Sequence, residues 1–167
     1  MADILIKNGE VVDGTGKTTK KKFDVAITNG LISDIDENIP ESKAKTIIDA
    51  TNKIVAPGFI DIQNHSDSYW TLFDQPDLLS LISQGITTII IGNCGSSLGP
   101  LPNLESIKSI QKWHNLSGVN INWSTFAEFL HSLEKNVSVN VGSLVGHATL
   151  RRGLLGDSVR KATSDEI

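Results

Sequence analysis

The sequence predicts an α/β protein in which a small β module precedes strand–helix units of a parallel sheet, as in a TIM-type (β/α) barrel. Residues 1–56 consist of short apolar, β-branched runs separated by Asn-Gly and Gly-rich turns. From residue 57 onward, apolar strand patterns alternate with helical patterns, which is typical of βα units. Polar residues follow each of these later strands, at the end where parallel barrels carry their active sites. We therefore expect two parts, residues 1–56 and residues 57–167, with the functional residues in the second.

The first part is expected to be built from hairpins and short strands. Asn8-Gly9 and Asn29-Gly30 each lie between apolar residues, which is a hairpin signal. The apolar pairs at 47–48 and 54–55 predict two further strands. The lysine-rich run at 17–22 is expected to be a solvated strand edge.

The second part is expected to begin a barrel without closing it. Pro76 and Gly85 mark the start and stop of one helix, and Ser124 is expected to cap another without a full capping box. Three strands cannot close an eight-stranded barrel, which typically takes about 250 residues. We therefore expect a chain that stops partway through a longer protein. The predicted strands are residues 58–63, 86–91 and 137–145, and the predicted helices are 76–84, 105–115, 124–135 and one opening at Ser164 as its N-cap.

Composition excludes several classes of protein. The chain has 167 residues, of which 39% are apolar and 20% charged, as in an ordinary globular protein. A net charge of −4 argues against nucleic acid as the main partner. No apolar run approaches the roughly 20 residues that cross a bilayer, and residues 1–6 lack the basic start of a signal peptide. A single cysteine, Cys94, suits a reducing compartment. We expect a cytoplasmic protein without a nucleic-acid or membrane partner.

The first strand of the second part ends in a polar cluster that contains His65. Gln63 and His65 are two residues apart, so on an extended strand their side chains would share one face. Taken alone, His65 would be interpreted as a hydrogen-bonded polar residue beside a turn. The segment Pro57-Gly58-Phe59-Ile60-Asp61 followed by His65 resembles the first barrel strand of the amidohydrolase superfamily, Pro-Gly-x-Ile-Asp-x-His-x-His. Gln63 occupies the position of the first histidine, and glutamine is a poor ligand for zinc.

The second strand ends in Gly92-Asn93-Cys94-Gly95. A lone cysteine is most often a small buried apolar residue, but a thiolate is also a good zinc ligand. This motif is similar to one subgroup of the superfamily, the N-acyl-D-amino-acid deacylases or D-aminoacylases, as are residues 83–88 and 96–101. The resemblance implies that Cys94 is a metal ligand, with His65 at a second metal position that Gln63 weakens.

Residues 144–151 resemble the family's Leu-Val-Gly-His-x-x-Leu-Arg. The resemblance favours His147 and Arg151 as groups at the rim that face substrate or support the metal ligands. An equally favoured interpretation is a histidine held by backbone hydrogen bonds and a surface arginine. Asp67 and Asn93 are further candidates for contact with substrate or with the ligands. His114 and His131 lie among polar residues of predicted helices and are interpreted as surface residues.

The resemblance covers essentially the whole chain and implies a zinc-dependent hydrolase of carbon–nitrogen bonds. Its substrate would be a small molecule, an N-acyl-D-amino acid, whose carbonyl the zinc polarises. The family's remaining histidines and its catalytic aspartate come from later strands, so no catalytic residue is expected among these residues. By itself the chain is expected to be inactive and poorly folded, because half of a four-coordinate zinc shell and the partner of the third strand are missing.

Three alternatives remain open. The first is a cyclic-amide hydrolase of the dihydroorotase or hydantoinase type. The second is a hydrolase that uses Cys94 as its nucleophile, with His65 or His147 as the base. The third is a degenerate binding module without activity, which Gln63 at a ligand position favours, because a metal site decays by losing ligands.

Overall fold

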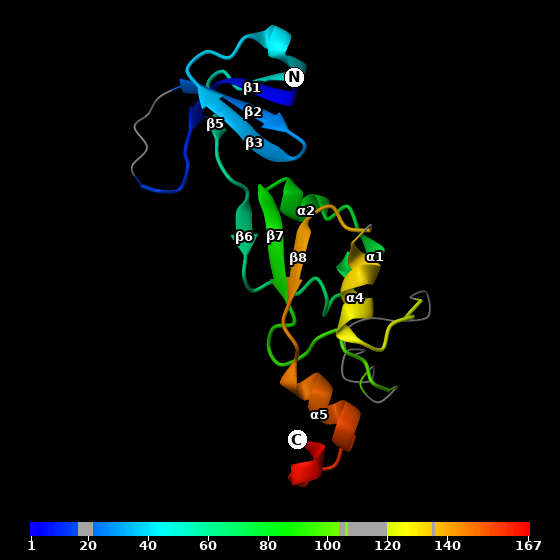
Figure 1. Ribbon diagram of the computed structural model, residues 1–167. Helices are drawn as coiled ribbons and strands as arrows, with labels where there is room; N and C mark the ends of the chain where they lie inside the picture. The colour runs from blue at the N-terminus through cyan, green and yellow to red at the C-terminus, as the bar shows by residue number, and fades with distance from the viewer. Residues whose placement is uncertain (17–21, 104–105, 107–119, 135) are drawn as a thin grey trace. The chain divides into compact units, whose positions relative to one another are not determined.

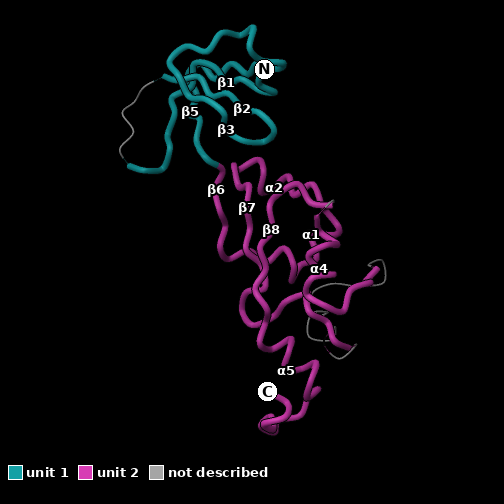
Figure 2. The backbone as a smooth tube through the Cα atoms, in the orientation of Figure 1, with its two compact units in different colours: residues 1–57 teal, residues 58–167 magenta. Residues whose placement is uncertain are grey.

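The computed structural model describes residues 1–16, 22–103, 106, 120–134 and 136–167. They form two compact units, Met1–Pro57 and Gly58–Ile167, which Figure 2 draws in different colours. Each unit has a sheet of its own, and the described helices of α type lie in the second, so the mixed α/β class is confirmed. The helix predicted at 105–115, with His114, lies outside the described residues apart from Ser106.

The described part of the first unit forms a five-stranded sheet with the order β3-β2-β1-β4, in which β5 also pairs with β1. The β1–β2 and β2–β3 pairs are antiparallel, whereas β4 and β5 run parallel to β1. The buried apolar cluster of this unit consists of Ala2, Leu5, Ala26 and Ile39. The elements are β1 (Ala2–Val11), β2 (Lys22–Thr28), β3 (Leu31–Asp36), the 3-10 helix η1 (Glu41–Lys43), β4 (Ala44–Asp49) and β5 (Ile54–Val55).

The two Asn-Gly pairs have different structures. Asn29-Gly30 forms the expected hairpin between β2 and β3, with φ of 51° and 76°. Positive φ at both residues is what a tight two-residue hairpin turn requires. The hairpin expected at Asn8-Gly9 is wrong, because β1 runs straight through it. Asn8 instead has φ of 64° at a shift in the β1–β2 register, as in a β-bulge. A Cβ at Gly9 would collide with Val55, so glycine at this position allows β5 to approach.

A buried carboxylate holds the bulge in place. Asp24 is 2% exposed and accepts hydrogen bonds from Asn8 N at 2.9 Å, Ile39 N at 2.9 Å and Lys7 Nζ at 3.0 Å. Burial disfavours the ionised form, but the hydrogen bonds outweigh burial and keep the pKa of Asp24 below its usual value. Ionised Asp24 therefore stabilises the first unit.

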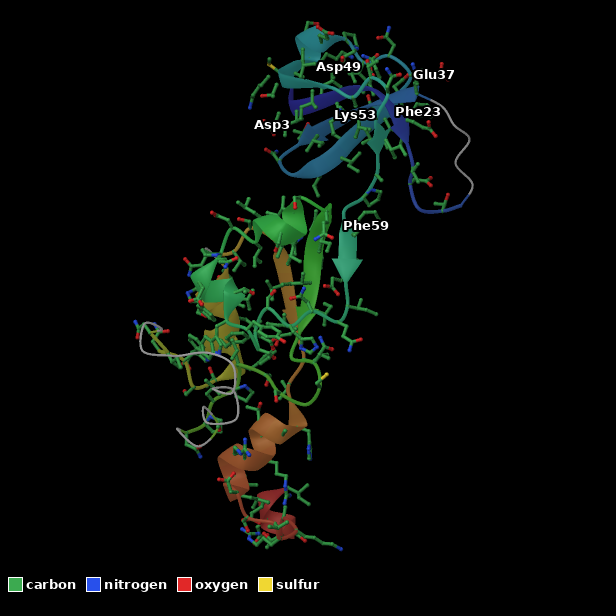
Figure 3. All side chains as sticks on the ribbon, turned by 180° about the vertical axis from the view of Figure 1, so that it is seen from behind. Asp3, Phe23, Glu37, Asp49, Lys53 and Phe59 are labelled. Carbon is green, nitrogen blue, oxygen red and sulfur yellow. The ribbon has the colours of Figure 1, made fainter. Side chains whose placement is uncertain are left out.

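An exposed ion pair on the same sheet contrasts with Asp24. The Asp3 carboxylate, on β1 (Figure 3), accepts hydrogen bonds from Lys45 Nζ at 2.7 Å and Asn29 N at 2.8 Å. Both side chains reach solvent, and exposed pairs of this kind contribute little to stability. Among the described ion pairs of the first unit, Lys7–Asp24 is the one whose loss matters most.

We predict that Asp24→Asn destabilises the first unit by roughly 3 kcal/mol at pH 7, because Lys7 loses its buried partner. The folded-state pKa of Asp24 is lowered, so its contribution is complete above the unfolded value and disappears as the pH falls through the folded value. Wild type and variant should therefore converge in strong acid. Hydrogen exchange of β1 and β2 amides measures the difference. Asp36→Asn, at the exposed position opposite Asp24 in the β2–β3 register, is the control. An equal loss in both variants would contradict the prediction.

Three parallel strands form the described sheet of the second unit, with β7 between β6 and β8 (Figure 1). The predicted parallel arrangement is confirmed. The second strand has the predicted bounds, whereas the outer strands are shorter than the predicted 58–63 and 137–145. The first strand ends early because the Asp61 carboxylate accepts a hydrogen bond from Gln63 N at 3.1 Å, which starts a turn. The strands are β6 (Phe59–Asp61), β7 (Ile86–Ile91) and β8 (Asn140–Ser143).

The helices of the second unit supply an apolar core against one face of β7. Trp123 stacks on Phe73 with ring centroids 5.3 Å apart and also packs against Phe129. Ile89 and Ile91 of β7 are fully buried in the same cluster. Burial of this many large side chains is the main stabilising term for the unit. The helices are α1 (Thr71–Asp74), α2 (Leu79–Ile82), α4 (Phe126–Leu133), α5 (His147–Leu155) and the 3-10 helix η4 (Ser164–Glu166).

Several helix ends differ from the sequence predictions. The predicted helix at 76–84 shortens to α2, because Leu78 takes a left-handed φ of 44° and buries its side chain. Helix α4 is capped by Thr125 and not by Ser124. Thr125 and Glu128 form a full capping box, whose hydrogen bonds lower the pKa of Glu128 to about 2. Likewise Thr163, and not Ser164, caps η4. Helix α5 was not expected at all.

Candidate metal centre

The site lies at the carboxyl ends of β6 and β7, where backbone hydrogen bonds join the two following loops. Asn64 N donates to Ile90 O at 3.0 Å, and Asn93 Nδ2 donates to Ile90 O at 2.9 Å and to Asn64 O at 3.3 Å. Asn64 is buried, and its own amide donates to the Asp61 carboxylate at 2.8 Å. These contacts fix the loop that carries His65 against the loop that carries Cys94.

His65 and Cys94 are brought together by this arrangement. Cys94 Sγ lies 3.9 Å from His65 Nε2, and the thiol is exposed. Cys94 has a left-handed φ of 57°, between Gly92 at 78° and Gly95 at 80°. Left-handed backbone is costly for a residue with a side chain, and such strain is concentrated at functional sites. The turn thus presents the thiol to solvent beside the imidazole.

Gln63 does not share a strand face with His65. Because β6 ends at Asp61, both residues lie in the turn that follows, where the two-residue alternation of a strand no longer applies. The expectation of a common strand face is therefore wrong. The Gln63 side chain is exposed, and the Gln63 backbone N–H donates a hydrogen bond to the Asp61 carboxylate.

Asp67 lies inside the protein and supports the second loop. Its side chain is 1% exposed, and its carboxylate accepts hydrogen bonds from Gly92 N at 2.9 Å and Ser68 N at 2.8 Å. Burial raises the pKa of Asp67 above its usual value despite these hydrogen bonds. Asp67 therefore ties the loop after β6 to the residue that follows β7.

The start of helix α5 lies against the same loop. Ala148 N donates to Gly95 O at 2.8 Å, so the first turn of α5 contacts the Cys94 turn through its backbone. His147, the first residue of the helix, is exposed. Arg151 points elsewhere: its guanidinium donates to Arg160 O at 2.6 Å and to Ser158 O at 3.4 Å. His131 is an exposed residue of α4 that pairs with Glu134 at 3.0 Å.

Sequence reasoning named Asp67 and Asn93 but missed other residues that hold these loops. Asp61 and Asn64 each accept a hydrogen bond from the backbone N–H two residues on, at 3.1 and 2.9 Å, a local pattern typical of Asp and Asn in turns. That pattern is a usable signal. Ser97 and Thr149, which join α5 to the Cys94 loop, pair over 52 residues and carry no such local signal.

The described residues supply two candidate ligands at this point. In that part of the chain, no group of three or more His, Cys, Asp or Glu side chains could hold a metal ion. Among the residues that the structure describes, no helix is long and apolar enough to cross a membrane.

The chain is similar to known proteins in both sequence and structure. A model of the amidohydrolase family, Amidohydro_3, matches residues 46–167. D-aminoacylase and N-acyl-D-aspartate deacylase of Alcaligenes xylosoxydans xylosoxydans are 34% and 38% identical to the chain over 99% of its length. A crystal structure of N-acyl-D-glutamate deacylase from Bordetella bronchiseptica, with zinc and a phosphonate mimic of the tetrahedral intermediate, superposes with a TM-score of 0.81 at 32% identity over 99% of the chain. The chain spans about a third of these relatives, 33%, 32% and 34% of their lengths.

We predict that Asn93→Asp weakens the joint between the loops, because a carboxylate oxygen would face the carbonyls of Ile90 and Asn64. The loss should be about 1–3 kcal/mol of unfolding free energy. Denaturant unfolding followed by tryptophan fluorescence reports on the second unit, since all three tryptophans lie in it. Asn140→Asp makes the same change at the opposite end of the sheet, where the amide is exposed. Equal destabilisation by both would count against a special role for Asn93.

Proposed function

Because the chain belongs to the amidohydrolase family, we propose that it contributes the first three strands of a TIM-type barrel and part of a zinc site for amide hydrolysis. The parallel order β6-β7-β8, with His65 and Cys94 beyond two adjacent strand ends, supports the barrel. The unit Met1–Pro57 would be the N-terminal part of a β-sandwich-like module.

The observation that carries the proposal is the 3.9 Å between Cys94 Sγ and His65 Nε2. Zinc binds sulfur at about 2.3 Å and imidazole nitrogen at about 2.0–2.1 Å, so two tetrahedral ligands of one ion lie about 3.6 Å apart. The observed separation is close to that value, and thiolate and imidazole are both preferred zinc ligands. The donor set therefore fits zinc.

The two ligands would have unequal roles. Cys94 would hold the metal that carries the chemistry, together with histidines from later strands of the complete barrel. His65 would serve a second metal position, at which the Cys94 sulfur would be a further ligand. Gln63 weakens this second position, because an amide is a poor zinc ligand. When bound, zinc supplies Lewis acidity that polarises an amide carbonyl and makes water more acidic.

The reaction we propose for the complete protein is hydrolysis of an N-acyl-D-amino acid. Water adds its oxygen to the acyl carbon, the amide C–N bond breaks, and a carboxylate and a D-amino acid leave. Sequence similarity to two deacylases extends over 99% of the chain, and this supports an N-acyl-D-amino acid over a cyclic amide as the substrate. The exposure of Cys94 beside His65 would also permit a thiol nucleophile, so the experiment below separates ligation from nucleophilic attack.

Other candidate residues would act around the ligands. Asp67 and Asn93 support the two loops through the hydrogen bonds described above, and we propose that they keep the ligands in place. His147 is exposed at the start of α5 and would face substrate at the rim. Arg151 would act indirectly, by fixing the segment that contains Ser158 and Arg160 against α5.

We predict that Cys94→Ala in the complete protein lowers zinc content and amidase activity together. The loss should exceed the roughly 10–100-fold typical of an outer hydrogen-bond partner of a metal ligand. His65→Ala should cost less, because its neighbouring ligand position already holds Gln63. Metal analysis by mass spectrometry and hydrolysis of N-acetyl-D-amino acids measure both, with His131→Ala as the control histidine. Hydrolysis of dihydroorotate or hydantoins in place of N-acetyl-D-amino acids would favour the cyclic-amide alternative.

Unchanged zinc content in Cys94→Ala would disprove the ligand role. If activity disappeared while zinc stayed bound, Cys94 would be a nucleophile. If the wild-type protein bound zinc but hydrolysed none of these substrates, the chain would belong to a binding module.

A further inference from the structure

We propose that Ser97 and Thr149 are positioning residues that fix the Cys94 turn against helix α5, so that the thiolate is preorganised for metal. The inference rests on the proposed function, and it assigns a role to two side chains whose hydrogen bonds go to neither His65 nor Cys94. It follows from the reciprocal hydrogen bonds between the two residues.

The contact between the two residues is reciprocal. Thr149 Oγ1 accepts a hydrogen bond from Ser97 N at 2.9 Å and donates one to Ser97 O at 3.2 Å. One hydroxyl on α5 thus satisfies both backbone groups of a single loop residue. Thr149 is 0% exposed and Ser97 is 1% exposed, so water cannot replace these bonds.

The Ser97 hydroxyl completes the connection. It accepts a hydrogen bond from Gly146 N at 3.0 Å and donates to Gly99 O at 2.7 Å. The loop after β7 and the turn before α5 are therefore joined in both directions, by a side chain from each. A buried network with every polar group satisfied is rigid.

The turn before α5 packs closely against the backbone of the Cys94 loop, which leaves no room for a side chain at Gly146. A Cβ at Gly146 would lie 2.5 Å from Gly95 O and 2.7 Å from the carbonyl carbon of Ser96, so the turn before α5 accepts glycine alone without movement. Ala148 N donates to Gly95 O in the same region. Gly95 follows Cys94 directly, so any shift of α5 is passed to the residue that bears the thiol.

The left-handed backbone of Cys94 explains why such support is needed. A φ of 57° is unfavourable for cysteine, and it persists where the surrounding structure determines it. The hydrogen bonds at Gly95 and Ser97 lie one and three residues beyond Cys94 and oppose its relaxation. Without them the thiol would sample other positions, and binding a metal would have to reorder the turn.

The test uses the complete protein loaded with cobalt(II) in place of zinc, because a thiolate–cobalt bond gives a charge-transfer band that reports on Cys94 itself. Thr149→Val keeps the shape of the side chain and removes the hydroxyl. We expect roughly tenfold weaker cobalt binding, the lower end of the range for outer partners of metal ligands, and a weakened, shifted band. Thr149→Ser restores the hydroxyl and should restore both. Ser97→Ala removes the acceptor of Gly146 N and should have the same effect on cobalt binding and on the band as Thr149→Val. If Thr149→Val does not fold, Ser97→Ala provides the test instead.

Leu155→Ala is the matched control, because Leu155 is the other buried residue of α5 and lies at the opposite end of the helix from the Cys94 loop. It should lower the melting temperature without changing cobalt affinity or the band. An equal loss of cobalt affinity in Leu155→Ala, or no recovery of affinity in Thr149→Ser, would contradict the positioning role of Ser97 and Thr149. A wild-type protein that binds cobalt without a thiolate band would overturn the proposed ligand and this inference together, whereas a normal band that Thr149→Val leaves unchanged would overturn this inference alone.

Discussion

The hydrogen bonds between the loops that follow β6 and β7 are the constraint on which the site depends. Asn64 N donates to Ile90 O at 3.0 Å, and the buried Asp67 carboxylate accepts from Gly92 N at 2.9 Å. Parallel strands place their carboxyl ends at one edge of a sheet, but they do not by themselves set side-chain distances. These bonds do so, and as a result His65 and Cys94, 29 residues apart in the chain, lie 3.9 Å from each other.

The same constraint accounts for the unusual features nearby. The left-handed Cys94 costs of the order of 1–3 kcal/mol, and satisfied hydrogen bonds on both sides of the turn offset it. Burial of Asp67 raises its pKa, because taking the ionised carboxylate out of water is unfavourable, and this too opposes the arrangement of the site. Helix α5 then packs on the far side of the turn through Ser97 and Thr149. The turn that carries the thiol is held by hydrogen bonds at Gly92, Gly95 and Ser97, while the thiol itself is exposed.

Local signals in the sequence predicted the parallel strands of the second unit and pointed to two candidate ligands that lie side by side. The β-branched run at 86–91 is a strand with the expected bounds, and the motifs around His65 and Cys94 led to residues that the structure brings together. Predictions failed where long-range contacts decide the conformation. Asn8-Gly9 is a bulge because β5 and Asp24 contact it, and Leu78 breaks its helix to enter the core. Thr149 looks like an ordinary helical threonine until its partner 52 residues away is known.

X-ray absorption at the zinc edge tests the central claim most directly, because it counts the atoms bound to the metal in the complete, zinc-loaded protein. Ligation by Cys94 predicts one sulfur at about 2.3 Å together with nitrogen or oxygen neighbours at about 2.0–2.2 Å. Since Cys94 is the one cysteine among these 167 residues, the sulfur signal should disappear in Cys94→Ala. A shell of nitrogen and oxygen alone in the wild-type protein, or a sulfur signal that survives the substitution, would contradict the account.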